Sequence, residues 1–194
     1  MIDYFALLDQ PRMPWLDLDK LKDAYHAKAR QNHPDLQTGD PSPTTETSFA
    51  NLNEAYQVLQ DPKRRLHHLL SLEGAPPGSS RVIPQELQDL FPEVGSLTQR
   101  VKVLLEELKT RTNQLSKSLL KPQILQLQTE VNAMRDKIRS LLGASATELE
   151  QRNIGWAKNP AGQIEALSNL YVLFAYLNRW LDQLNEIAFQ LALD

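Results

Sequence analysis

The 194-residue sequence contains no cysteine, which excludes disulfide bonds, thiol catalysis and cysteine-ligated zinc or iron–sulfur clusters. It also lacks a basic excess: 21 Lys and Arg stand against 24 Asp and Glu, giving a net charge of −3. Because nucleic-acid binding requires a basic surface, a nucleic-acid partner is not expected. No apolar run approaches the roughly 20 residues that span a bilayer, and the N-terminus has no signal-peptide pattern. We therefore expect a cytoplasmic protein with no membrane partner.

Strand-like alternation is also missing, whereas apolar residues recur at helical spacing along the whole chain. The patterns predict helices over 3–8, 18–32 and 45–60, and another from Pro62. Asp17 or Asp19 can cap the second of these, because an Asp oxygen accepts a free N–H of the first helical turn. The sequence predicts an all-α protein.

A stretch rich in glycine, proline and serine, residues 73–80, is the clearest boundary in the chain. We predict two domains, 1–74 and 84–194, joined by a linker over 75–83. The second domain is expected to be a helical bundle. Its first helix is predicted to be interrupted at Pro92, a later helix to end at Gly143, and the last helix to run from Pro160 towards Leu193.

The tripeptide His33-Pro34-Asp35 stands where the predicted helix 18–32 ends. A helix turns about 100° per residue, so three basic residues of that helix fall within an arc of roughly 80° that leads to the tripeptide. These residues are Lys22, His26 and Arg30. A narrow cationic strip suits docking on an acidic protein surface, where charges contribute association rate and register.

Further residues around this tripeptide make the first 74 positions resemble a J-domain. Tyr25 lies eight residues before His33, a polar loop follows Asp35, and the next helix ends in the run Ala55-Tyr56-x-Val58-Leu59-x-Asp61-Pro62, followed by Arg65. The opening Asp3-Tyr4-Phe5 and the ending His68-Leu69-Leu70-x-Leu72-x-Gly74 are similar to HscB-type iron–sulfur co-chaperones. The resemblance implies a four-helix J-domain with an antiparallel hairpin of its second and third helices, followed by a helical domain.

The resemblance also implies how the chain acts. J-domains dock on a DnaK/HscA-type chaperone and stimulate its ATPase, so the ATP chemistry belongs to the partner. The chain is then expected not to be an enzyme and to need no cofactor. The tripeptide would be the trigger, and the basic strip together with Tyr25 would be the docking surface.

The helical domain of HscB-type proteins holds the iron–sulfur scaffold protein as client. The corresponding segment suggests four client contacts, Leu87, Leu90, Phe91 and Val94, although these residues could equally form the core of the bundle. Of the two readings, we favour exposure for Leu90 and Phe91. Two alternatives remain: a J-domain protein with a different client, and an adaptor that forms a homodimer through 167–193 and recruits the chaperone to an assembly.

The adjacent histidines His67 and His68 raise the question of a metal site. Neighbouring residues on a helix point about 100° apart, so they cannot chelate one ion as an i,i+4 pair could. We expect no metal site, and we expect His68 to occupy the aromatic position of the J-domain pattern instead.

Overall fold

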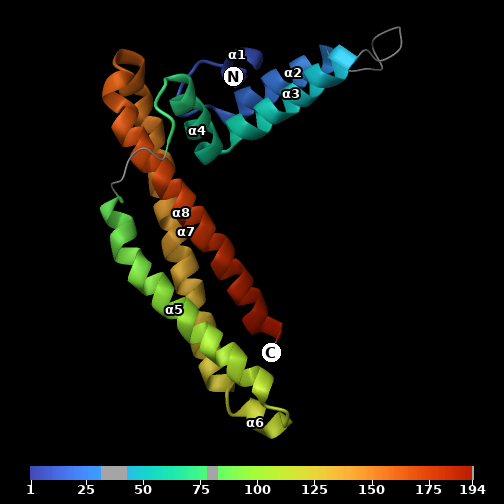
Figure 1. Ribbon diagram of the computed structural model, residues 1–194, viewed down its shortest axis with the longest axis vertical. Helices are drawn as coiled ribbons and strands as arrows, with labels where there is room; N and C mark the ends of the chain where they lie inside the picture. Colours follow the sequence, from blue (N-terminus) through green and yellow to red (C-terminus); the bar gives the residue numbers. More distant parts are fainter. Residues whose placement is uncertain (32–42, 78–82, 194) are drawn as a thin grey trace. The chain divides into compact units, whose positions relative to one another are not determined.

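The computed structural model describes residues 1–31, 43–77 and 83–193, and every regular element within these ranges is helical (Figure 1). The all-α prediction is confirmed. Two compact units emerge from the packing. The first contains Met1–Arg81 together with Ala146–Tyr171, and the second contains Val82–Ser145 together with Val172–Asp194. Residues 146–171 thus pack with the N-terminal part, and the predicted division into domains 1–74 and 84–194 stays a prediction.

The first unit begins with four helices: α1 (Tyr4–Leu7), α2 (Leu18–Gln31), α3 (Pro43–Gln60) and α4 (Pro62–Leu72). Their starts follow from capping. The Asp17 carboxylate accepts from the backbone N–H groups of Asp19 and Lys20, which identifies Asp17 as the cap of α2. The Asp61 carboxylate caps α4, and Pro62 takes the first helical position, where its missing N–H costs nothing.

Helix α3 packs against α1, α2 and α4 and so centres the core of this region. Figure 1 shows α2 and α3 side by side. The apolar residues that pack between the helices are almost completely buried: Phe5, Leu8, Leu16, Leu21, Leu52, Ala55, Leu59, Leu66, Leu69 and Leu70.

The segment between α1 and α2 is held by the end of a much later helix, α7 (Lys121–Lys158). The side-chain amide of Asn153 accepts from the backbone N–H of Trp15 at 2.9 Å and donates to the carbonyl of the same residue at 3.0 Å. Indole Nε1 of the buried Trp156 donates to the carbonyl of Arg12 at 2.8 Å. These contacts satisfy backbone groups in a stretch that has no helix of its own.

The second unit is built on α5 (Gln85–Thr110), the short α6 (Gln114–Ser118), the first part of α7, and the later part of α8 (Ile164–Leu193). Apolar residues of α5 recur at alternating three- and four-residue intervals, the pattern of a helical bundle seam, and all are buried: Leu87, Leu90, Val94, Leu97, Val101, Leu104 and Leu108. Polar pairs join the helices at the surface, including Lys137–Glu93 at 2.7 Å between α7 and α5.

Two predicted helix boundaries in this unit are wrong. Helix α5 continues through Pro92, and α7 continues through Gly143. Pro92 removes one backbone donor, but Leu90 and Val94 on either side are buried in the seam, and their packing keeps the helix intact. A glycine inside a helix costs only about 1 kcal/mol relative to alanine, too little to end a helix that packs along its length. The sequence signal was local, whereas the helix is stabilised by tertiary contacts.

Candidate functional site

The exposed face of α2 carries the predicted docking residues. Lys22, His26 and Arg30 are exposed and recur every four residues, so they form one row along the helix. Leu21 is completely buried and anchors the helix from its other side. The structure therefore brings the three basic side chains together on an open surface. His33, Pro34 and Asp35 lie outside the described residues.

Tyr25 is placed differently from the basic row. Its hydroxyl donates to Oδ1 of Asn53 at 2.6 Å, and its ring stacks on Tyr56 with centroids 4.5 Å apart and planes 21° apart. Both partners belong to α3. Tyr25 therefore fixes the position of α2 against α3 and so orients the helix that carries the basic row.

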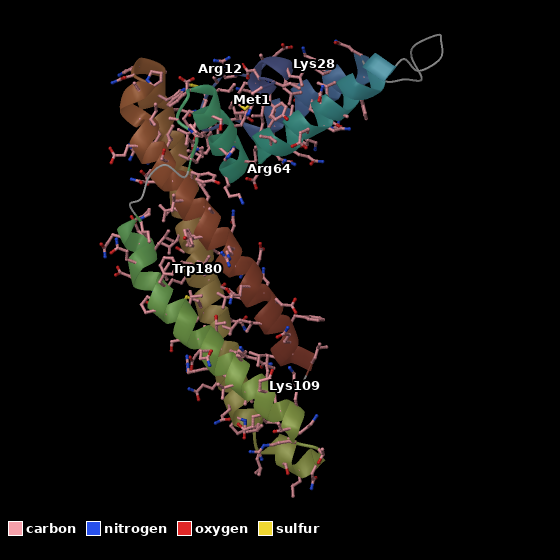
Figure 2. All side chains as sticks on the ribbon, viewed as in Figure 1. Met1, Arg12, Lys28, Arg64, Lys109 and Trp180 are labelled. Carbon is pink, nitrogen blue, oxygen red and sulfur yellow. The ribbon has the colours of Figure 1, made fainter. Side chains whose placement is uncertain are left out.

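Lys28 points to α1 rather than into the docking row. Its Nζ lies 2.6 Å from the carboxylate of Asp9, which comes two residues after the end of α1 and has a positive φ of 51° (Lys28 is labelled in Figure 2). The lysine side chain is 30% exposed, so its stem covers apolar surface while the ammonium group reaches the carboxylate. The pair ties α2 to the end of α1.

The first turn of α4 contains a buried cation, Arg65, which is 2% exposed. Its guanidinium donates to the carbonyl oxygens of Pro14 and Leu59. Burial lowers the pKa of Arg65 to about 10, and the nearby Asp61 carboxylate opposes the shift. The side chain therefore stays charged at neutral pH and holds three segments of the J-domain region together.

His68 occupies the aromatic position predicted for it and also has a polar function. Its ring stacks on Tyr4, with centroids 4.5 Å apart, and lies against Phe5. Its Nε2 accepts the backbone N–H of Tyr4 at 3.0 Å. Burial lowers the pKa of His68, while the Asp3 carboxylate opposes that shift. His68 therefore caps α1 as a neutral imidazole, a role that the sequence pattern did not reveal.

Of the four suggested client contacts, three are core residues. Leu87, Leu90 and Val94 are at most 3% exposed, so the expectation that Leu90 is exposed is wrong. The reason is the heptad spacing of α5, which places all three in the seam of the bundle. Phe91 is 38% exposed and remains accessible to a partner.

Phe91 is part of an aromatic cluster that the sequence analysis did not assemble. Its ring meets Trp180 edge-on at 4.9 Å and Tyr176 at 5.2 Å, both on α8 (Trp180 is labelled in Figure 2). Tyr176 and Trp180 are four residues apart, so they share a helix face. That spacing was visible in the sequence, but the pairing of α8 with Phe91 was not.

Two features that the sequence did not lead us to expect are a metal site and a membrane-spanning helix. Over the described ranges, no three His, Asp or Glu side chains come together as a metal site would require. No helix over the same residues has the length and apolar character needed to cross a bilayer.

The sequence of this chain is similar to those of known proteins. The DnaJ domain family matches residues 3–68. Over 76 residues the chain is 40% identical to the co-chaperone protein HscB of Proteus mirabilis, a match that covers 38% of this chain and 44% of that protein. Over 75 residues it is 43% identical to the chaperone protein DnaJ 2 of Thermus thermophilus, covering 38% of this chain and 25% of that protein. The chain thus matches less than half the length of these curated relatives.

Solved structures extend the similarity of fold beyond the DnaJ domain. Chaperone HscB from Vibrio cholerae superposes with a TM-score of 0.55 at 20% identity, covering 98% of this chain and 99% of that one. Human co-chaperone protein HscB superposes with a TM-score of 0.55 at 19% identity, covering 95% of this chain and 81% of that one. At these identities the likeness concerns the fold. Together, the matches identify a DnaJ domain over residues 3–68 and show that the chain resembles HscB-type co-chaperones, with a helical region after that domain that is HscB-like in fold.

Proposed function

We propose that the chain is a co-chaperone that docks on a DnaK/HscA-type chaperone through the basic row of α2 and the His33-Pro34-Asp35 tripeptide, and that docking stimulates the partner's ATPase. The observation that carries the proposal is the exposed row of Lys22, His26 and Arg30 on a helix that Tyr25 holds against α3. A cationic row on a fixed helix offers an acidic surface a defined register.

The row can be tested without disturbing the fold, because its side chains are exposed. Steady-state ATP hydrolysis by a DnaK/HscA-type chaperone is measured with the wild type, with Lys22→Ala/Arg30→Ala and with a matched control, Lys20→Ala. Lys20 is also an exposed lysine of α2, but it lies outside the row and near Asp17. We expect the double variant to need a much higher concentration for half-maximal stimulation, and the difference to shrink at high salt. Equal stimulation by the double variant and the control would refute the docking row.

The tripeptide is tested separately. We expect His33→Gln to abolish stimulation while its far-UV circular dichroism stays that of the wild type. Full stimulation by this variant would exclude the J-domain mechanism for the chain, whatever the result for the basic row.

We further propose that the helical region delivers a client, with the iron–sulfur cluster scaffold protein as the expected one. Support comes from the fold similarity to HscB and from the partly exposed aromatic cluster of Phe91, Tyr176 and Trp180. Aromatic side chains are enriched where proteins bind proteins, since a ring gives a large contact area at low entropic cost.

The client surface has a natural control within the chain. Phe91→Ala should weaken capture of the scaffold protein in a pull-down, whereas Phe189→Ala should not. Phe189 is 60% exposed on α8 and has no ring partner among the described residues. Equal loss in both variants, or no capture by the wild type, would refute this client. A dimer in light scattering that Phe189→Ala dissociates would instead favour the adaptor alternative.

A further inference from the structure

A cavity of about 300 Å³ opens on the first unit, with walls from α1, α3, α4 and the part of α8 that belongs to this unit. Pockets for small molecules begin at about this size. Six side chains with rings or charges line it: Tyr4, Lys63, Arg64, His67, His68 and Tyr171. The cavity takes no part in the proposed docking on a chaperone or in the aromatic client surface.

The charge of the lining has one sign. Lys63 and Arg64 are cationic, and no carboxylate is among the side chains that form the wall. The guanidinium of Arg64, labelled in Figure 2, forms an ion pair with the carboxylate of Glu54 at 2.7 Å. Lys63 has no ion-pair partner among the described residues. Both cations stand in the first turn of α4, the positive end of the helix dipole, where cations are unfavourable. The cavity is therefore an electropositive site that an anion would stabilise.

His68 adds a hydrogen-bond donor to these charges. Its Nε2 accepts the N–H of Tyr4, so the proton of the neutral ring must be on Nδ1. No acceptor among the described residues is bonded to Nδ1, although the side chain is 5% exposed and lines the cavity. Nδ1 is therefore open to an acceptor on a ligand in the cavity.

Aromatic rings complete the wall. Tyr4 and His68 are stacked at 4.5 Å, and His67 and Tyr171 lie 5.8 Å apart at an angle of 52°. The rings of His67 and Tyr171 are half-buried or exposed, so a face of each can meet a ligand. Stacking on such rings is typical of sites that bind planar bases.

We propose that this cavity binds a small phosphate monoester that carries a planar ring, the chemistry of a nucleoside 5′-monophosphate. Its phosphate would contact Lys63 and Arg64 and accept from Nδ1 of His68, and its ring would lie against His67 and Tyr171. A phosphate dianion matches one ammonium and one guanidinium fork, since both groups form charge-assisted hydrogen bonds to phosphate oxygens.

The test is isothermal titration calorimetry of the full chain with three probes: adenosine 5′-monophosphate, inorganic phosphate and adenosine. We expect one site, with the nucleotide binding more tightly than either of its parts and more weakly as salt is added. Lys63→Gln should weaken nucleotide binding by at least about tenfold, as the loss of a charge-assisted hydrogen bond implies. Lys20→Gln, an exposed lysine outside the cavity, should leave it unchanged.

The ring contact is tested by two changes at one position. Tyr171→Leu should weaken binding of the nucleotide but not of phosphate, and Tyr171→Phe, which keeps a ring, should bind as the wild type does. Absence of saturable binding at millimolar nucleotide, or unchanged binding by Lys63→Gln, would overturn the proposal. Phosphate that binds as tightly as the nucleotide would overturn the assignment of the ring.

Discussion

Replacing His68 by leucine tests whether a neutral imidazole caps α1. The first N–H groups of a helix have no partner within it, and in α1 each finds another. The Asp3 carboxylate accepts from Phe5 and Ala6, and Nε2 of His68 accepts from Tyr4 at 3.0 Å. Leucine keeps the apolar volume but removes this acceptor, so the Tyr4 N–H is left without a partner.

The magnitude follows from two losses. An unsatisfied, partly buried N–H costs about 1–3 kcal/mol, and the lost ring stacking on Tyr4 adds about 0.5–1.5 kcal/mol. Since leucine recovers part of the apolar contact, we expect the free energy of unfolding to fall by about 2 kcal/mol near pH 8. For a chain of this length that corresponds to roughly 4–8 °C in melting temperature. The control is His67→Leu, an exposed neighbour on the same helix, which should change stability by less than about 0.5 kcal/mol.

The pH dependence gives the sharper result. Burial lowers the folded-state pKa of His68 below the unfolded value of 6.5, so near and below that pH the unfolded chain binds the proton more readily. The stability that His68 contributes is therefore fully present above pH 6.5 and is lost as the pH falls through the unfolded pKa towards the lower folded one. The variant cannot titrate at this position, so the difference between wild type and His68→Leu should shrink between about pH 8 and about pH 5.5.

The assay is urea unfolding of the full chain followed by far-UV circular dichroism across this pH range. The other histidines are identical in both proteins, so the difference isolates His68. If the difference stays constant, or grows as the pH falls, then His68 is not a neutral acceptor in the folded chain and the capping argument is refuted.

Three further changes follow from single contacts. Lys28→Leu loses the ion pair with Asp9, worth about 0–1 kcal/mol, but gains apolar burial. We therefore expect a melting temperature close to that of the wild type and unchanged ATPase stimulation. A clear loss of stimulation would place Lys28 in the docking surface. Leu90→Ala should lower the free energy of unfolding by about 2–5 kcal/mol in urea titrations, and a change below about 1 kcal/mol would contradict its burial. Asn153→Ala removes two hydrogen bonds to the backbone of Trp15 and should cost about 1–3 kcal/mol by the same measurement, whereas an unchanged midpoint would show that this contact contributes nothing.

The parts of the fold that could be predicted from the sequence are those set by local chemistry. The start of α2 was visible because Asp17, one of the two cap candidates, satisfies backbone donors two and three residues away. The basic row of α2 was visible because residues at four-residue spacing share a helix face. Pro92 and Gly143 were misleading because packing along α5 and α7 exceeds the local cost of either residue.

The rest depends on contacts between distant residues, which no local pattern encodes. His68 meets Tyr4 across 64 positions, and Lys28 meets Asp9 because α1 and α2 both pack against α3. The heptad spacing of α5 was present in the sequence and would have identified Leu90 as a core residue. The aromatic cluster at Phe91 could not be predicted, because the sequence does not show that α8 packs against α5.

The contact between Asn153 and Trp15 has a consequence for the order in which the chain is made. The two residues are 138 positions apart. At about 5–20 residues per second, a ribosome takes roughly 7–28 seconds to synthesise the intervening chain. During that interval Arg65 is available to bind the Pro14 carbonyl, but the Trp15 backbone has only water as a partner. The nascent J-domain can therefore form its own core first, and the segment before α2 acquires its last partner only when the end of α7 emerges.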